Sequence, residues 1–173
     1  MDQIVVFSDW ELFQCLHHLG KLQIVEELPY RCVLLKDMFL EDTPYSKQSQ
    51  LEEEIKALSN VSIDIPKNRY SNDIYDPDCE IKLIDQYALI LGLEYKNDNP
   101  SNDIIICSSY DALSNEYIEL HDLKGVFSQT LIFMLKKKSI LSHRDILDLI
   151  EFIKKEHLRS KDQEKFLNLL RIE

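Results

Sequence analysis

The sequence predicts an α/β fold, a three-layer α/β/α sandwich around a mainly parallel central sheet. Short apolar runs, typical of buried strands, alternate along the chain with longer segments of helical periodicity. The clearest strands are residues 4–7 (Ile-Val-Val-Phe) and 104–107 (Ile-Ile-Ile-Cys). Strands separated by helices pair in parallel and are covered on both faces. In such sheets, functional residues lie at the carboxyl ends of the strands.

In the first part of the chain, a capping box and a glycine bound the first helix. Ser8 and Glu11 have the Ser-x-x-Glu spacing that satisfies two backbone amides at a helix start, and Gly20 marks the stop. The predicted helical segments are 9–19, 22–28, 37–42 and 47–58. The predicted strands are 4–7, 32–35 and 61–65, the last an edge strand.

The second part begins with a polar loop at residues 67–77. A helix is predicted to begin at Asp78 and to stop at Gly92. The strands predicted after it are 104–107 and 117–120, and the helices are 126–138, 142–159 and 161–170. We therefore expect one domain, residues 1–173, with the C-terminal helices 142–170 packed on it.

Composition limits the compartment and the chemistry. Apolar residues make up 45% of the 173 residues, as in an ordinary globular domain. No apolar run is long enough to cross a bilayer, so we expect a cytoplasmic protein without membrane contact. The cysteines are widely spaced and form no CxxC pair, which favours reduced core thiols over a zinc site. Three glycines rule out a glycine-rich phosphate loop.

The net charge of −11 opposes nucleic-acid binding, because phosphate recognition relies on lysine and arginine. The exception would be a local cluster of basic residues. Residues 136–138 are all lysine, and the C-terminal third is the least acidic region. This region fits either a nucleic-acid footprint or an ordinary solvated surface, and the second interpretation is preferred.

Several acids fall where an α/β protein places its site. Asp9 lies just beyond the first strand, Glu41 and Asp42 end the short helix after the second strand, and Glu80 lies in a predicted first helical turn. Hard divalent cations need several oxygen ligands, which acids from different elements can supply. The plainer alternative is that Asp9 and Glu80 complement helix dipoles and that the other two are solvated charges.

The order of segments around these acids resembles PIN-like proteins related to toxin ribonucleases. The opening "IVVFSDWELFQCLHHLGKLQIVEEL" is similar to that family's strand ending in Ser-Asp, its helix and its Gly-(Lys/Arg)-Leu step. The segments "YRCVLLKDMFLED", "DCEIKLIDQYALILG", "DIIICSSYDAL" and "LIFMLKKKSILS" resemble the family's later elements in order. The similarity spans nearly all of the chain and rests on pattern rather than on a long motif.

The resemblance implies a catalytic, metal-binding set of acids. Asp9 is the first, Glu41 the second with Asp42 as its substitute, and Glu80 the third. The implied cofactor is Mg²⁺ or Mn²⁺, and the implied substrate is RNA. The implied activity is that of a metal-dependent endoribonuclease, for which the toxin of a toxin–antitoxin-like pair is one role.

The chain also departs from the family pattern. The residues after the central strand are Cys107, Ser108 and Ser109, where an acid is usual. The nearest substitutes are Asp111, as a fourth metal ligand, and Asp122.

Trp10 stands where a small hydroxyl residue usually follows the first acid. These departures favour a second hypothesis, a PIN-like domain without catalysis that binds a protein partner or forms a homodimer. A third, an α/β protein for an unrelated ligand, stays open.

Overall fold

The computed structural model describes residues 3–41, 43–70, 74–78, 80–108, 118–155, 164, 167–168 and 170–171. Its strands are β1 (Gln3–Phe7), β2 (Arg31–Leu35), β3 (Val61–Asp64), β4 (Asp103–Ser108) and β5 (Lys124–Phe127). Its α-helices are α1 (Glu11–His18), α2 (Gln48–Lys56), α3 (Leu83–Asp98), α5 (Ser128–Lys137) and α6 (His143–Lys155). The 3-10 helices η1 (Leu22–Glu27) and η2 (Lys36–Leu40) flank β2.

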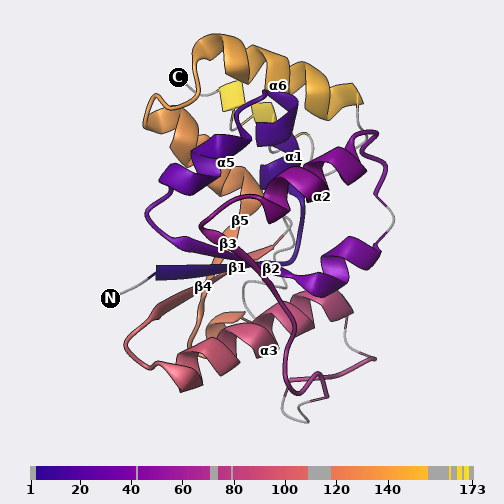
Figure 1. The fold of residues 1–173 in the computed structure, drawn as a ribbon, viewed down its shortest axis with the longest axis vertical. Helices are drawn as coiled ribbons and strands as arrows, with labels where there is room; N and C mark the ends of the chain where they lie inside the picture. Colours follow the sequence, from indigo (N-terminus) through magenta and orange to yellow (C-terminus); the bar gives the residue numbers. More distant parts are fainter. Residues whose placement is uncertain are drawn as a thin grey trace.

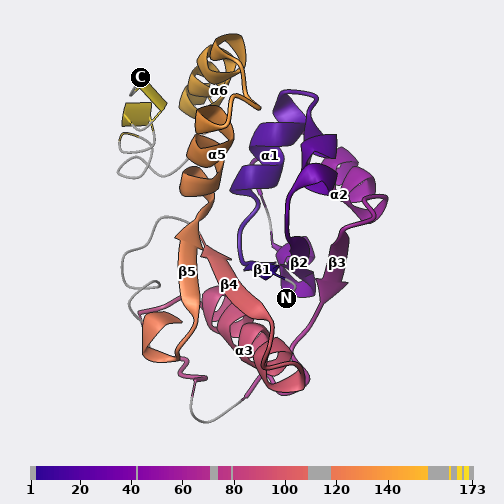
Figure 2. The same ribbon diagram turned by 90° about the vertical axis from the view of Figure 1, so that its left-hand side faces the viewer.

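These strands form one sheet in the order β3-β2-β1-β4-β5, and every pairing is parallel. Helix α3 covers one face, and α1, α2, α5 and α6 lie on the other (Figures 1 and 2). The predicted three-layer α/β/α sandwich is therefore confirmed, and the described sheet is wholly parallel.

The core forms where the sheet meets these helices. Central strand β1 pairs with β2 on one side and β4 on the other, and its residues Val6 and Phe7 are fully buried. Phe7 packs edge-on against Phe13 of α1, with ring centroids 4.9 Å apart. The predicted strands 4–7, 32–35, 61–65 and 104–107 coincide with β1 to β4, and β3 lies at the sheet edge as expected.

The predicted capping box is wrong. The Ser8 side chain turns away from α1 and hydrogen-bonds Asp85 and the Cys107 carbonyl. The Glu11 backbone N–H instead donates to Asp9 Oδ1 at 2.9 Å, and the N-cap residue Trp10 makes no side-chain cap. Because the Ser8 hydroxyl hydrogen-bonds residues that are distant in the sequence, it does not cap α1.

The predicted bounds of α3 are also wrong. The helix begins at Leu83 instead of Asp78, and it continues through Gly92 to Asp98. A Cβ at Gly92 would lie 2.5 Å from Ile106 Cδ1. Gly92 is thus a packing residue that lets α3 approach β4 closely, and it is not a stop signal.

The predicted secondary structure of residues 118–127, before α5, is wrong. Residues 118–120, predicted as a strand, are helical, while the strand β5 occupies Lys124–Phe127, partly where a helix was predicted. Tyr117 lies outside the described residues. Helix α6 lies within the predicted 142–159, and most of the predicted helix 161–170 falls outside the described part.

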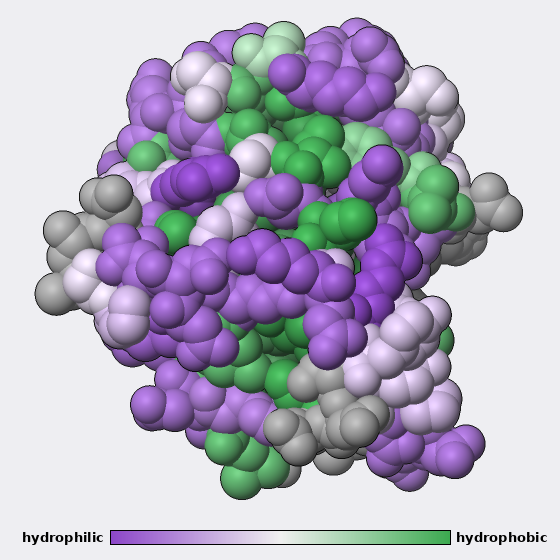
Figure 3. Space-filling view, turned by 60° about the horizontal axis from the view of Figure 1, so that its bottom comes forward, coloured by the Kyte–Doolittle hydropathy of each residue, from purple (hydrophilic) through white to green (hydrophobic). Residues whose placement is uncertain are grey.

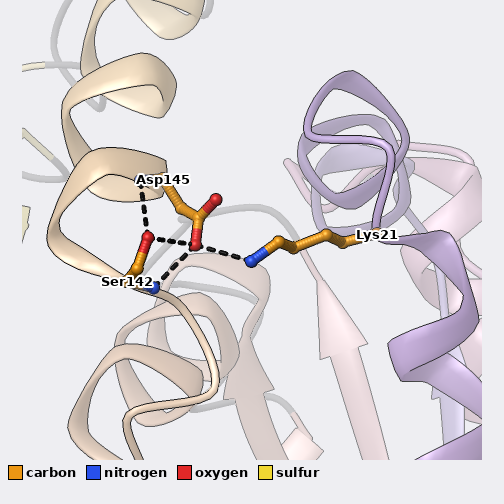
Figure 4. A network of polar contacts seen from close by, with 3 residues as sticks. All are labelled: Lys21, Ser142 and Asp145. Atoms are coloured by element: carbon orange, nitrogen blue, oxygen red, sulfur yellow. Dashed lines mark hydrogen bonds and ion pairs between the residues drawn. The ribbon is translucent and has the colours of Figure 1, made fainter.

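Helix α6 is joined to the rest of the fold by a charged network (Figure 4). The Lys21 ammonium lies 2.7 Å from Asp145 Oδ2, which also accepts hydrogen bonds of 2.6 Å from the Ser142 backbone N–H and hydroxyl. Nearby, the His18 ring stacks on Phe152, with centroids 4.1 Å apart.

On the face in Figure 3, hydrophobic residues are seen in patches between hydrophilic ones. Across the described part of the chain, no helix combines the length and apolar character that a bilayer span requires.

Candidate functional site

The candidate site lies at the carboxyl edge of the sheet, where the parallel strands all end. The chain crosses from β1 to β2 on one side, and β4 lies on the other side of β1, so the strand order reverses there. Open α/β sheets bind ligands at such a reversal. The Ser8 backbone N–H donates to the Cys107 carbonyl at 2.9 Å, which holds the ends of β1 and β4 together.

Asp9 lies two residues beyond the end of β1. Its Oδ1 accepts hydrogen bonds from the Ser128 hydroxyl at 2.7 Å and from the Glu11 backbone N–H at 2.9 Å. Its Oδ2 is buried and has no hydrogen-bond partner among the described residues. Burial raises the Asp9 pKa to about 6, although the Ser128 and Glu11 hydrogen bonds act in the opposite direction.

Asp85 is a second acid of the site, supplied by the first turn of α3. It is buried, and the Ser8 hydroxyl donates to its Oδ1. Its negative charge adds to the rise in the Asp9 pKa, so the two carboxylates interact across the carboxyl edge. Two acids that repel each other in a dry setting are stabilised by a bound cation.

Glu41 and Lys82 lie at the rim. Glu41 directly follows η2 and is exposed, and Lys82 is the half-buried N-cap residue of α3. The pKa of Glu41 is raised by partial desolvation, and Asp85 and Asp37 add to the rise while Lys82 lowers it. Lys82 also lowers the Asp9 pKa, so it is an electrostatic partner of both acids.

Hydrogen bonds from the start of α5 reach the acids around the start of α1. Gln129 of α5 donates to the Glu11 carboxylate of α1, and both residues are buried. Ser128, next in the chain, donates to Asp9 and also lies 3.3 Å from the Cys107 thiol. Burial raises the Cys107 pKa, which fits the predicted core thiol and opposes a role as nucleophile.

The predicted site residues lie in different places in the structure. Asp9 lies at the centre and Glu41 at the rim. Glu80 is exposed and precedes α3, and no described interaction joins it to Asp9 or Glu41. Asp42 and Asp111 lie outside the described residues. Asp122 lies in an exposed turn before β5, with φ of 57°.

Asp85 and Lys82 were not predicted. Asp85 stands inside the apolar run "LIDQYALILG", and an acid in a run that must be buried needs a partner or a ligand. The predicted helix start at Asp78 placed Glu80, instead of Asp85, in the first helical turn.

Hard divalent cations such as Mg²⁺ or Mn²⁺ bind oxygen ligands, and Asp9 and Asp85 are the buried or partly buried acids at this edge. Among the described residues, no group of three or more His, Cys, Asp and Glu side chains is placed to hold a metal ion. Mg²⁺, however, is commonly held by one or two carboxylates together with substrate phosphates and water. The buried Asp9 Oδ2, and the buried Ser108 Oγ that has no described hydrogen-bond partner, are oxygens suited to such an ion.

Comparisons of the chain with protein-family models, with curated proteins and with solved structures found no match.

Proposed function

We propose that this chain is a PIN-like, metal-dependent endoribonuclease with its site at the carboxyl end of β1. The observation that carries the proposal is the placement of Asp9. This acid lies at the strand-order reversal, with its buried Oδ2 unpaired among the described residues and Asp85 as an electrostatic neighbour. The resemblance in the order of segments supports the same assignment. A role as the toxin of a toxin–antitoxin-like pair belongs to this proposal.

In this proposal, Asp9 and Asp85 hold Mg²⁺ or Mn²⁺, with Glu41 at the rim. The ion supplies positive charge that activates water and stabilises the charge developing on a phosphodiester. Ser128 and the Glu11 backbone N–H keep the Asp9 carboxylate fixed through its Oδ1. Ser8 does the same for Asp85. Lys82, placed beside Asp9 and Glu41, offers a cation to a phosphate oxygen.

The test is cleavage of a mixed RNA pool with Mn²⁺ or Mg²⁺, comparing the wild type with Asp9→Asn, Asp85→Asn and Glu80→Gln. The first two substitutions should abolish cleavage, because each removes a ligand charge while keeping an acceptor oxygen. Glu80→Gln is the matched control and should cleave normally, because Glu80 is exposed and forms no metal-binding group with Asp9 and Glu41 in the part of the chain that the structure describes. A second readout is the melting temperature, which Mn²⁺ should raise in the wild type and not in Asp9→Asn.

A second candidate is a PIN-like domain without catalysis that acts as a protein-binding or assembly subunit. Two observations favour it. The positive charge of Lys82 already offsets the negative charges of Asp9 and Glu41, and Trp10 is a residue of the hydrophobic core. Trp10 is buried, donates to the Met38 carbonyl at 3.1 Å and packs edge-on against Phe39. Folded wild type that neither cleaves RNA nor gains stability from Mn²⁺ would select this candidate, with a protein partner or a homodimer.

A further inference from the structure

Three tyrosines gather beside the acid site. Tyr70 and Tyr75 come from the loop before α3, and Tyr87 lies on α3 itself. The Tyr70 and Tyr75 rings meet edge-on, with centroids 5.1 Å apart. Arg69, next to Tyr70 in the chain, lies over the Tyr87 ring, so all three tyrosines belong to one part of the surface. We call these residues the tyrosine cluster.

An arginine links the tyrosine cluster to the acid site. The Arg69 guanidinium lies 5.5 Å from the centroid of the Tyr87 ring, within cation–π range. It also forms a two-point ion pair with Asp37 of η2, at 2.9 and 3.0 Å. Asp37 belongs to η2, the 3-10 helix whose C-cap residue is Glu41, so the same short helix connects the arginine to the rim of the acid site.

The tyrosine cluster is partly packed against the core and partly exposed to solvent. Tyr87 is half-buried against the core, but Tyr70 is 64% exposed and presents its ring to solvent. An exposed aromatic ring beside an arginine held in a fixed position is a surface on which a planar group can stack.

We propose that the tyrosine cluster is a base-stacking subsite for single-stranded RNA whose backbone passes the Asp9–Asp85 site. This inference rests on the proposed function and names the form of the substrate. Stacking of a base on an aromatic ring joins two uncharged groups, so this contact does not depend on the positive charge that a chain with a net charge of −11 lacks. Unpaired bases expose their faces to such rings, whereas the bases of a duplex stay stacked on one another.

The experiment measures equilibrium binding of fluorescently labelled oligoadenylate by anisotropy. It uses the full chain carrying Asp9→Asn, so that cleavage does not interfere, with Mg²⁺ present throughout. Adding Tyr70→Ala should weaken binding about tenfold. Tyr70→Trp should restore it, because the stacking surface returns. Leu147→Ala, which trims an exposed residue of α6, is the matched control and should bind like its parent.

A second probe tests whether binding depends on the bases. An oligomer of the same length with abasic ribose-phosphate units should bind weakly, and Tyr70→Ala should not weaken it further. Equal binding of the two oligomers, unchanged binding by Tyr70→Ala, or no binding of either oligomer would overturn the subsite. A change in sedimentation of Tyr70→Ala without a change in RNA binding would also overturn it, because the cluster would then be a self-association surface.

The two proposals fail in different ways. RNA cleavage by the wild type, unaffected by Tyr70→Ala, would remove the subsite and leave the nuclease. Base-dependent binding that Tyr70→Ala weakens, without any cleavage by the wild type, would remove the nuclease and keep the subsite.

Discussion

Asp9 is a carboxylate whose ionisation the fold opposes. Its pKa is raised to about 6 because burial outweighs the hydrogen bonds from Ser128 and Glu11, and Asp85 adds to the rise. An acid with a raised pKa in the folded state stabilises the fold when protonated. That stabilisation is complete below the unfolded pKa near 3.8, and it is lost as the pH rises through about 6.

We therefore expect Asp9→Asn to be more stable than the wild type at pH 7. The amide oxygen can still accept the bonds from Ser128 and Glu11, while the buried charge is gone. The gain in unfolding free energy should be about 3 kcal/mol at pH 7 and should disappear as the pH falls to about 4. Urea unfolding of both proteins across this range measures it. Equal stability at every pH would mean that the Asp9 carboxylate is well solvated.

The sequence located this site only in part. Asp9 was predictable because it follows an unmistakable strand, and in a parallel sheet the residue after a strand reaches the functional edge. Asp85 was not chosen because its position depends on where α3 begins, and turn-rich residues before a helix leave that start ambiguous. Lys82 acquires its role only through tertiary placement beside Asp9 and Glu41, which spacing along the chain does not encode.

At the scale of elements, the buried strands were the most predictable. Apolar β-branched runs such as those of β1 and β4 exclude a solvated helix, and β2 is recognised by its run of four apolar residues, all buried. Strand β5 was missed because its four residues, Lys-Gly-Val-Phe, are few and only one is β-branched. Its pairing with β4 is a long-range contact that propensity cannot supply.

The charged network of Lys21, Ser142 and Asp145 supplies part of the attachment of helix α6. Burial raises the Asp145 pKa, but the hydrogen bonds from Lys21 and Ser142 outweigh it and lower the pKa to about 2. A lowered pKa contributes stability above the unfolded value near 3.8, and that stability is lost as the pH falls through about 2.

Asp145→Asn should therefore lower the unfolding free energy by about 1 kcal/mol at pH 7, a small value because the Lys21 side chain is 35% exposed. The difference from the wild type should shrink as the pH falls from about 4 toward 2. Urea unfolding at pH 7 and pH 3 tests this. Asp148→Asn, on the same helix with a 58% exposed side chain, is the control and should change stability less. A deficit that persists unchanged at low pH would contradict the electrostatic explanation.

At the scale of the whole molecule, topology and charge act in opposite directions on the proposed function. The strand order places the ends of β1 and β4 side by side, which brings Asp9 and Ser108 to one edge. The chain, however, has 31 acidic and 20 basic residues, and several of the basic ones are already paired with carboxylates. These paired residues are Lys21, Lys56, Lys67, Arg69 and Lys124. The acidic residues outnumber the basic ones by eleven, so the chain as a whole repels phosphates.

This charge balance predicts a shallow salt dependence for RNA binding. Each phosphate contact on a single strand contributes about −0.7 to the slope of log K against log salt, so one or two contacts give roughly a three- to sevenfold loss over a fourfold rise in salt. Titrating Asp9→Asn with oligoadenylate at increasing monovalent salt, with Mg²⁺ held constant, measures the slope. A loss on the order of a thousandfold would instead require a basic groove with many phosphate contacts. The lysines at residues 136–138 would then be the first to replace, and the acidic character of the chain would no longer argue for binding through the bases.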